Sequence, residues 1–289
     1  MEILKIEDFS FKFPNASDYT LRNINLSLNP GEFVLLMGIS GSGKTTLLRQ
    51  CKRSLAAFGE KSGNIYFDGK NINELDLRDD ASGIGFVQQD PENQIVTDKV
   101  WHELAFGLES LGMDQKTMRL KVGEIAGFFG MESWFNSKVT DLSGGQLQMV
   151  NLASILAMQP KLLLLDEPTA MLDPIASIEF FQGLNRVCRE LGITVLLSEH
   201  RLTEPYPLAE RVLYLDDGLI KFDGSPKDFA ISMKKDPDEI VESLPSPVQI
   251  YVKSTWEGEV PLTVGDALRS KPNFCLLYTS DAADDSLRV

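Results

Sequence analysis

The chain has 289 residues, of which 43% are hydrophobic and 24% are charged. This composition can bury a sizeable core in one large domain or two small ones, and it excludes a largely disordered protein. The 42 acidic residues outnumber the 28 basic ones and give a formal net charge of −14, which disfavours non-specific attraction to nucleic acid or to anionic membranes.

The amino-terminal part shows the two-residue period of strands that have one buried face. Apolar and polar residues alternate over 9–13 and again over 24–28. The continuous apolar run 33–37 instead predicts a strand buried on both faces, and a glycine-rich loop and a helix-favouring segment, 45–58, follow it. Two further strands are predicted over 63–68 and 83–87.

The remaining pattern alternates helices with apolar strands. Residues 99–134 carry apolar side chains at helical spacing and predict a small helical insert, at about 92–145. Helices are expected over 146–158 and 175–191, and buried strands over 162–165 and 194–197. This order favours an α/β fold, in which a parallel sheet is covered on both faces and an antiparallel β subdomain precedes it.

The strongest local motif lies between a predicted strand and a predicted helix. Residues 38–45 match G-x-x-x-x-G-K-[ST], in which small residues let backbone N–H groups surround phosphates at a helix N-terminus. Lys44 would reach the β and γ oxygens, and the Thr45 hydroxyl would bind Mg²⁺. The expected nucleotide contacts in this loop are Gly38, Ser40, Gly41, Ser42, Gly43, Lys44, Thr45 and Thr46.

The second half of a nucleotide site follows the buried strand 162–165. A strand of a parallel sheet would hold Asp166 and Glu167 at its carboxyl end, beside the glycine-rich loop. Asp166 would then hold Mg²⁺ through water, and Glu167 would orient and polarise the attacking water. The alternative is a hydrophobic strand that ends in Asp-Glu without a function.

A third motif is not explained by one nucleotide site in one chain. Residues 142–146 read LSGGQ, and with the glycine-rich loop and the Asp-Glu strand end they resemble the ATP-binding subunits of ABC transporters. The family order continues with a Q-loop glutamine, a D-loop aspartate and a switch histidine: here Gln89, Asp173 and His200. The resemblance covers about residues 1–232 and implies a P-loop NTPase fold of the ABC type.

The resemblance implies shared ATP sites between two cassettes. In the family the signature caps the ATP that the opposite subunit holds, so two molecules would sandwich two nucleotides. By the same resemblance His200 would contact the γ-phosphate and the attacking water. Gln89 would belong to the catalytic residues and bind Mg²⁺, and Asp173 would be the aspartate of the D-loop. The trans-acting signature residues would be Ser143, Gly144, Gly145 and Gln146.

Two assignments have alternatives. Phe13 stands where the family usually has a tyrosine that stacks on adenine, and a phenylalanine retains a π-face but lacks the hydroxyl. Its alternative is a buried aromatic at a strand end. Gln89 is preferred over the adjacent Gln88 because the family glutamine stands two residues before a proline, here Pro91.

The segment 89–111 resembles more narrowly the ATPases of energy-coupling factor and cobalt or nickel importers. This implies import of a vitamin or a metal ion through a transmembrane scaffold subunit and a substrate-binding membrane subunit, with residues 91–101 lining the groove for the scaffold. The alternatives are a soluble ABC-type ATPase that acts as a mechanical switch on nucleic acid or ribosomes, and a nucleotide-binding regulatory subunit without turnover. The net charge of −14 and the lack of a basic stripe oppose binding to nucleic acid.

Cysteine usage and hydropathy indicate the compartment. Cys51, Cys188 and Cys275 have neither the spacing of a metal knuckle nor an even number for disulfides. The amino terminus lacks a signal-like stretch, and the longest apolar runs are far below the ~20 residues that span a bilayer. We expect a cytoplasmic protein that lies on the inner face of the membrane through its partners.

The chain divides into three parts by sequence. Residues 1–232 form the expected ATP-binding domain, and 233–274 predict a loosely structured extension, similar to the connection to a second ATPase domain in tandem proteins. The protein would work as a homodimer or as such a tandem pair. The stretch 275–289 resembles one reading frame of a sequencing-library adapter and is expected to be non-native, the alternative being a genuine tail.

Overall fold

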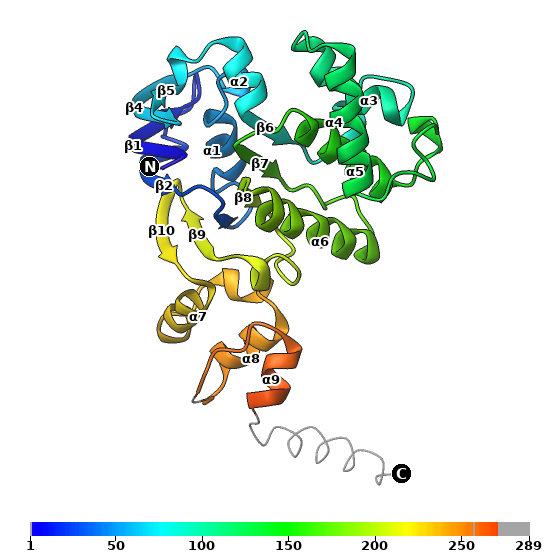
Figure 1. Cartoon of the computed structure of the whole chain (residues 1–289). Helices are drawn as coiled ribbons and strands as arrows, with labels where there is room; N and C mark the ends of the chain where they lie inside the picture. The colour runs from blue at the N-terminus through cyan, green and yellow to red at the C-terminus, as the bar shows by residue number, and fades with distance from the viewer. Residues whose placement is uncertain (1, 257, 271–289) are drawn as a thin grey trace.

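The computed structural model describes residues 2–256 and 258–270, and a large mixed sheet forms its centre (Figure 1). The strands of this sheet are β3 (Phe33–Met37), β6 (Ile84–Val87), β7 (Leu162–Asp166), β8 (Thr194–Ser198), β9 (Arg211–Asp216) and β10 (Leu219–Gly224). Their order is β10-β9-β3-β8-β7-β6. Neighbours run parallel except for the β9–β10 pair, as the alternation of strands and helices predicted.

A smaller antiparallel sheet packs beside it, at the blue and cyan end of the chain in Figure 1. It contains β1 (Leu4–Lys12), β2 (Leu21–Leu28), β4 (Glu60–Phe67) and β5 (Lys70–Asn71), in the order β2-β1-β4-β5. The predicted β-rich front is therefore present. Its first strand begins at Leu4, earlier than the alternation over 9–13 indicates, and ends before Phe13.

The helices cover the large sheet and form the predicted insert. They are α1 (Lys44–Gln50), α2 (Leu77–Gly83), α3 (Val100–Ser110), α4 (Gln115–Phe128), α5 (Gly144–Ala157), α6 (Pro174–Leu191), α7 (Pro226–Lys235), α8 (Ser246–Lys253) and α9 (Val264–Ser270). Helices α3 and α4 make up most of the insert. None of the helices within the described ranges is long and apolar enough to cross a bilayer.

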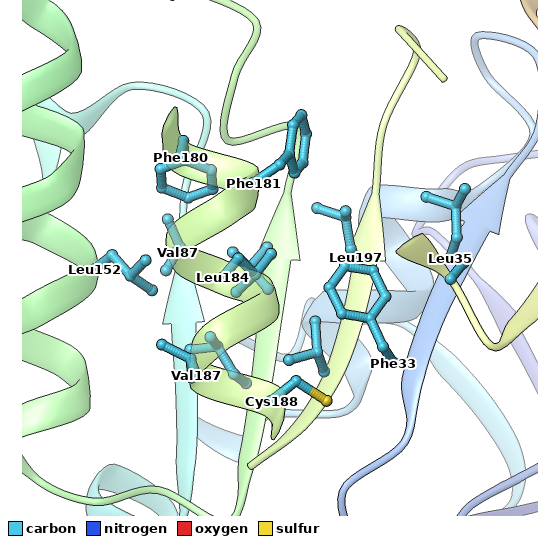
Figure 2. Close-up of a cluster of buried hydrophobic side chains, with 14 of the residues drawn as sticks. Phe33, Leu35, Val87, Leu152, Phe180, Phe181, Leu184, Val187, Cys188 and Leu197 are labelled. Carbon is cyan, nitrogen blue, oxygen red and sulfur yellow. The ribbon is translucent and has the colours of Figure 1, made fainter. Parts of the chain in front are cut away.

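Both faces of the large sheet are buried. Along β3, Phe33 and Leu35 point into one hydrophobic cluster, and Val34 and Leu36 point into a second cluster that the antiparallel sheet and α1 close. Figure 2 shows the first cluster, in which α6 directs Phe180 and its neighbours toward β3, β6 and β8. The strand-end loops therefore rise from a platform fixed on both sides.

The helix after the glycine-rich loop is shorter than the sequence predicts. The pattern favoured helix over 45–58, whereas α1 ends at Gln50. Lys52 adopts an extended backbone, and its buried ammonium donates to the carbonyl oxygens of Asp80 (2.7 Å) and Ile84 (2.5 Å). Since a buried charge needs such partners, long-range hydrogen bonds end the helix where local propensity would continue it.

The described part of the extension, 233–256 and 258–270, is largely helical, so the prediction of a loosely structured segment is wrong there. A helical turn, Glu239–Ser243, leads into α8, and α9 follows. Pro247 lies in the first turn of α8, where proline is tolerated, so it does not interrupt the helix. Leu244 and Val248 are fully buried in the same cluster as α6. The suspected non-native stretch, 275–289, lies outside the described residues.

The packing of the extension predicts its share of the stability. Leu244→Ala should lower the free energy of unfolding by about 2–5 kcal/mol, because it leaves a cavity in the main core. Leu268→Ala on α9, where the side chain is 74% exposed, should change it by less than about 0.5 kcal/mol. Urea unfolding of both variants measures the difference. Equally small effects would mean that the extension does not stabilise the core.

Candidate functional site

The loops that carry the predicted motifs leave one edge of the large sheet. Parallel pairing sets Leu36 of β3 opposite Ser198 of β8, and Ser198 opposite Asp166 of β7. Val87 of β6 is paired with Leu165. Because the carboxyl ends of these strands are in register, the loops after β3, β6, β7 and β8 emerge side by side, as in other sites at the carboxyl edge of parallel sheets.

The glycine-rich loop needs its glycines. A Cβ on Gly38 would lie 2.3 Å from the carbonyl oxygen of Leu215, and Gly43 has a left-handed φ of 107° directly before α1. The Ser42 hydroxyl is buried and, within the described part of the chain, has no hydrogen-bond partner. Of the other predicted contacts, Ser40 and Gly41 are exposed, and Thr45 and Thr46 are half-buried.

Lys44 is buried at the start of α1, with 4% of its surface exposed. Its ammonium donates to the carbonyl oxygens of Gly38 (2.8 Å) and Ile39 (3.1 Å), so it curls back over the loop. Burial lowers the pKa of Lys44, although the nearby carboxylates of Glu167 and Asp166 oppose this effect. A cation desolvated in this way gains when negatively charged oxygens replace the two carbonyls.

Asp166 connects two other loops. Its Oδ1 accepts from the Thr45 hydroxyl at 2.9 Å and from the Ser198 hydroxyl at 3.0 Å. A carboxylate beside a hydroxyl is an all-oxygen donor set, which suits a hard cation such as Mg²⁺. Ser198, which the motifs do not single out, orients the carboxylate from the neighbouring strand.

Glu167 and His200 form a pair across the strand ends. Nε2 of His200 lies 2.8 Å from Oε1 of Glu167, and the His200 side chain remains 45% exposed. The backbone of Glu167 is left-handed, with φ 49°. This conformation is uncommon for a residue other than glycine and costs about 1–3 kcal/mol, a form of strain that is found at functional sites. The two predicted catalytic side chains are thus in contact.

Glu199 is a buried acid that the motifs do not predict. It is 3% exposed, and its Oε1 accepts from the backbone N–H (3.0 Å) and the hydroxyl (2.7 Å) of Thr169. Burial raises the pKa of Glu199 to about 6, despite these hydrogen bonds and one from the His200 N–H. The only signal in the sequence is its place between Ser198 and His200, directly after a buried strand.

The loop after β6 is held by glutamines other than the predicted one. Gln89 is exposed. Gln94 accepts from the Gln88 N–H at 2.8 Å and donates to the Phe86 carbonyl at 2.6 Å. Gln148 of α5 donates to the carbonyls of Gln88 (3.2 Å) and Pro168 (2.8 Å). Gln89 is therefore free to point toward a ligand, while the backbone around it is fixed.

The signature begins α5. Ser143 caps this helix, and its N–H and hydroxyl exchange hydrogen bonds with Gln146 in a capping box. Gly144 is exposed, whereas a Cβ on Gly145 would lie 2.7 Å from that of Ala176. Among the described residues, no hydrogen bond or ion pair joins the signature to the glycine-rich loop. Asp173 is likewise exposed and caps α6.

Phe13 lies just beyond β1 and is 39% exposed. Its ring packs edge-on against Phe11 at 4.8 Å between centroids, so it is supported from below. The alternative of a buried strand-end aromatic is excluded by this exposure. Hydrogen bonds from Thr20 to Phe11 and from Arg22 to Gly218 fix the turn beside it.

Known proteins are similar to this chain in both sequence and fold. The family model described as ABC transporter matches residues 21–170. A protein of Bacillus thuringiensis, provisionally named an ABC transporter ATP-binding protein, is 44% identical over 93% of this chain and 49% of its own length. The energy-coupling factor transporter ATP-binding protein EcfA1 of Ligilactobacillus salivarius is 38% identical over 79% of this chain and 80% of its own. The chain spans about half the length of the first of these relatives.

Two solved structures extend the comparison. CbiO1 of Clostridium perfringens, part of the ABC transporter complex cbiONQ, superimposes with a TM-score of 0.72 at 28% identity, over 82% of this chain and 96% of that one. The ATP-binding cassette MJ0796, dimeric in a post-hydrolysis state with ADP and Pi, gives 0.65 at 29% identity over 77% and 98%. The chain belongs to the ABC transporter family, and it is similar to the ATP-binding proteins of that family.

Proposed function

We propose that the chain hydrolyses ATP to drive a membrane importer of the energy-coupling factor type, which carries a vitamin or a metal ion. The observation that carries the proposal is the division of the site: the hydrolytic side chains share one sheet edge, while the signature is exposed at the start of α5. The names of two similar proteins support the subtype, since one is an energy-coupling factor ATPase and the other belongs to cbiONQ.

The residues of the glycine-rich loop fit the phosphates of ATP. The buried Ser42 hydroxyl has a free donor, and the loop passes so close to Leu215 that only glycine fits at position 38. Lys44 can exchange its two carbonyl partners for phosphate oxygens of greater negative charge. Phe13 offers an exposed ring face on which adenine can stack.

Thr45, Asp166 and Gln89 are the proposed magnesium ligands. When bound, Mg²⁺ would neutralise phosphate charge that develops during hydrolysis. The chain itself contributes the orientation: Ser198 holds the Asp166 carboxylate, and Thr45 keeps its hydroxyl toward the same oxygen. Glu167 would accept a proton from the attacking water, and His200, in contact with it at 2.8 Å, would hold its carboxylate in place.

A second cassette would complete each ATP-binding site. The first turn of α5 leaves Ser143 and Gly144 exposed, and within the described structure no hydrogen bond or ion pair joins Ser143–Gln146 to the glycine-rich loop. The N-terminus of a helix favours negative charge, here the γ-phosphate held by the facing subunit, with Asp173 beside it. The dimeric state of MJ0796 supports this arrangement. The facing cassette is a second copy or, in a longer tandem protein, a second domain.

A groove beside the loop after β6 fits a membrane partner. It has a volume of about 520 Å³ and is lined by Gln94, Val96, Phe106 and other residues of α2, α3 and α5. Val96 and Phe106 are exposed and apolar. The groove overlaps the segment 91–101, so we assign it to the transmembrane scaffold subunit, which would place the chain at the cytoplasmic face beside a substrate-binding membrane subunit.

The proposed boundaries follow the motifs. Residues 1–232 would form the ATP-binding domain with its helical insert at about 92–145, and 233–274 would form an extension, whose described residues pack on this domain. The stretch 275–289 is proposed to be non-native on its sequence alone. Curated relatives about twice as long support a tandem protein as the complete form.

One prediction from this proposal concerns Glu167. Glu167→Gln should bind ATP normally and lower steady-state hydrolysis by at least about 10²-fold, because the amide cannot accept the proton of the attacking water. It should also trap a dimer in ATP, which sedimentation detects. Near-normal turnover would remove Glu167 from the proposed role.

A further prediction tests whether the ATP site is shared between two chains. Gly144→Asp should fold and bind ATP, because a Cβ at this position meets nothing closer than Leu172 at 4.0 Å. It should not dimerise on ATP and should lose hydrolysis, since the new carboxylate would face a γ-phosphate. Gly123→Asp is the matched control: it adds the same charge at an exposed helix glycine with open space around it, and it should stay active.

Mixing two inactive variants shows whether the signature acts on the ATP of its own chain or on that of the partner chain. Gly144→Asp and Lys44→Ala are each expected to be inactive, but a mixed dimer contains one intact site, made of the first chain's glycine-rich loop and the second chain's signature. Partial recovery of hydrolysis on mixing is therefore the expected result. Full activity of Gly144→Asp as a monomer would contradict the shared site and the importer built on it.

The last prediction of this section concerns the partner. Affinity purification from detergent-solubilised membranes should recover integral membrane subunits, and Val96→Asp in the groove should abolish this recovery while ATP binding persists. Gly123→Asp is again the control. Recovery of ribosomes or RNA in place of membrane subunits would favour the mechanical-switch alternative.

A further inference from the structure

The turn after β7 is strained, so contacts with other segments must hold its conformation. Glu167 is left-handed, and the chain then turns through Pro168 and Thr169 toward α6. Within the turn, the Ala170 N–H donates to the Glu167 carbonyl at 3.2 Å. Such a conformation persists only where the surroundings hold it, so the contacts of this turn show what keeps the Glu167 side chain in place.

Two buried side chains hold the turn from different elements. Gln148 of α5 donates to the Pro168 carbonyl at 2.8 Å. Glu199, from the end of β8, accepts both the N–H and the hydroxyl of Thr169 through one oxygen, at 3.0 and 2.7 Å. Its other oxygen accepts the N–H of His200 at 3.3 Å. One carboxylate therefore binds the turn that carries Glu167 and the backbone of His200.

We infer that Glu199 is a positioning residue for ATP hydrolysis, which ties the turn that bears Glu167 to the loop that bears His200 and so keeps their side chains in contact. The inference rests on the proposed roles of Glu167 and His200 and deepens them. Glu199 does not touch the reacting atoms: it acts through the 2.8 Å contact between the other two.

The burial of Glu199 argues against a role in packing alone. Desolvation raises the pKa of its carboxyl group to about 6, and the negative charge of Glu167 adds to this. Ionisation at neutral pH therefore costs stability at a position where a neutral side chain could fill the space. A buried carboxylate that lowers stability, at the edge of a reaction site, is typical of a functional constraint.

The test compares variants that remove different parts of the tie. Glu199→Ala removes all three hydrogen bonds and should lower kcat by about ten- to hundredfold, whereas KM for ATP should change less than about twofold, because the glycine-rich loop is untouched. Glu199→Gln retains an acceptor for Thr169 and should lower kcat by a smaller factor than Glu199→Ala does. Thr169→Val removes only the hydroxyl donor, with little change of shape, and should also lower kcat.

A double-mutant cycle distinguishes positioning from general destabilisation. Because Glu199 acts through His200, Glu199→Ala should have little further effect on kcat in a His200→Ala background. Glu32→Gln is the matched control: this glutamate also accepts a backbone N–H, from Asn29 at 2.9 Å, but at the opposite end of β3, and its kcat should remain normal. All rates are compared at equal folded fraction.

Each outcome decides the question. Unchanged kcat in Glu199→Ala, or effects of Glu199→Ala and His200→Ala that multiply, would overturn the inference while leaving ATP hydrolysis by the chain in place. A wild-type chain that does not hydrolyse ATP, or is insensitive to Glu167→Gln, would overturn the proposed function and the inference with it.

Discussion

The two hydrogen bonds that the Asp166 carboxylate accepts are the interaction on which the rest of the site depends. The carboxylate accepts from Thr45 at the start of α1 and from Ser198 at the end of β8, while its own strand, β7, lies two strands from β3. These two hydrogen bonds lock three chain segments, each far from the others in sequence, into one constellation. Lys44 adjoins Thr45, Glu167 adjoins Asp166, and His200 lies two residues after Ser198, so all three belong to the segments that these bonds join.

The packed sheet stabilises the site, whereas several residues at the carboxyl edge of the sheet are held in unfavourable states. Helix α6 covers one face of the large sheet (Figure 2), and the antiparallel sheet and α1 cover the other face. On this rigid platform the edge holds three unfavourable features: a desolvated lysine ammonium, a left-handed glutamate and a buried carboxylate. A well-packed core can hold such groups in one geometry, which preorganises them for a charged ligand.

Local patterns predicted the parts of the fold that local physics determines. The apolar runs of β3, β7 and β8 gave buried strands because each run is short and continuous, and the glycine-rich loop was clear because its residue types are specific. The end of α1 was not predictable, since it depends on Lys52 reaching Asp80 and Ile84 across the fold. Similarly, Gln148 and Glu199 make hydrogen bonds to segments that are distant in the sequence, and no spacing in the sequence marks such contacts.

The extension likewise makes contacts that the sequence did not predict, here across a proposed domain boundary. Motif content ends near residue 232, but hydrophobic packing does not: Leu202, two residues after His200, is buried in the same cluster as Leu244 and Val248. A cavity of about 360 Å³ lies where this switch loop meets the extension, lined by His200, Leu244 and Gln249 among others. The loop that bears His200 and the segment that contains Leu244 and Val248 therefore share one hydrophobic core, although no motif in the sequence connects them.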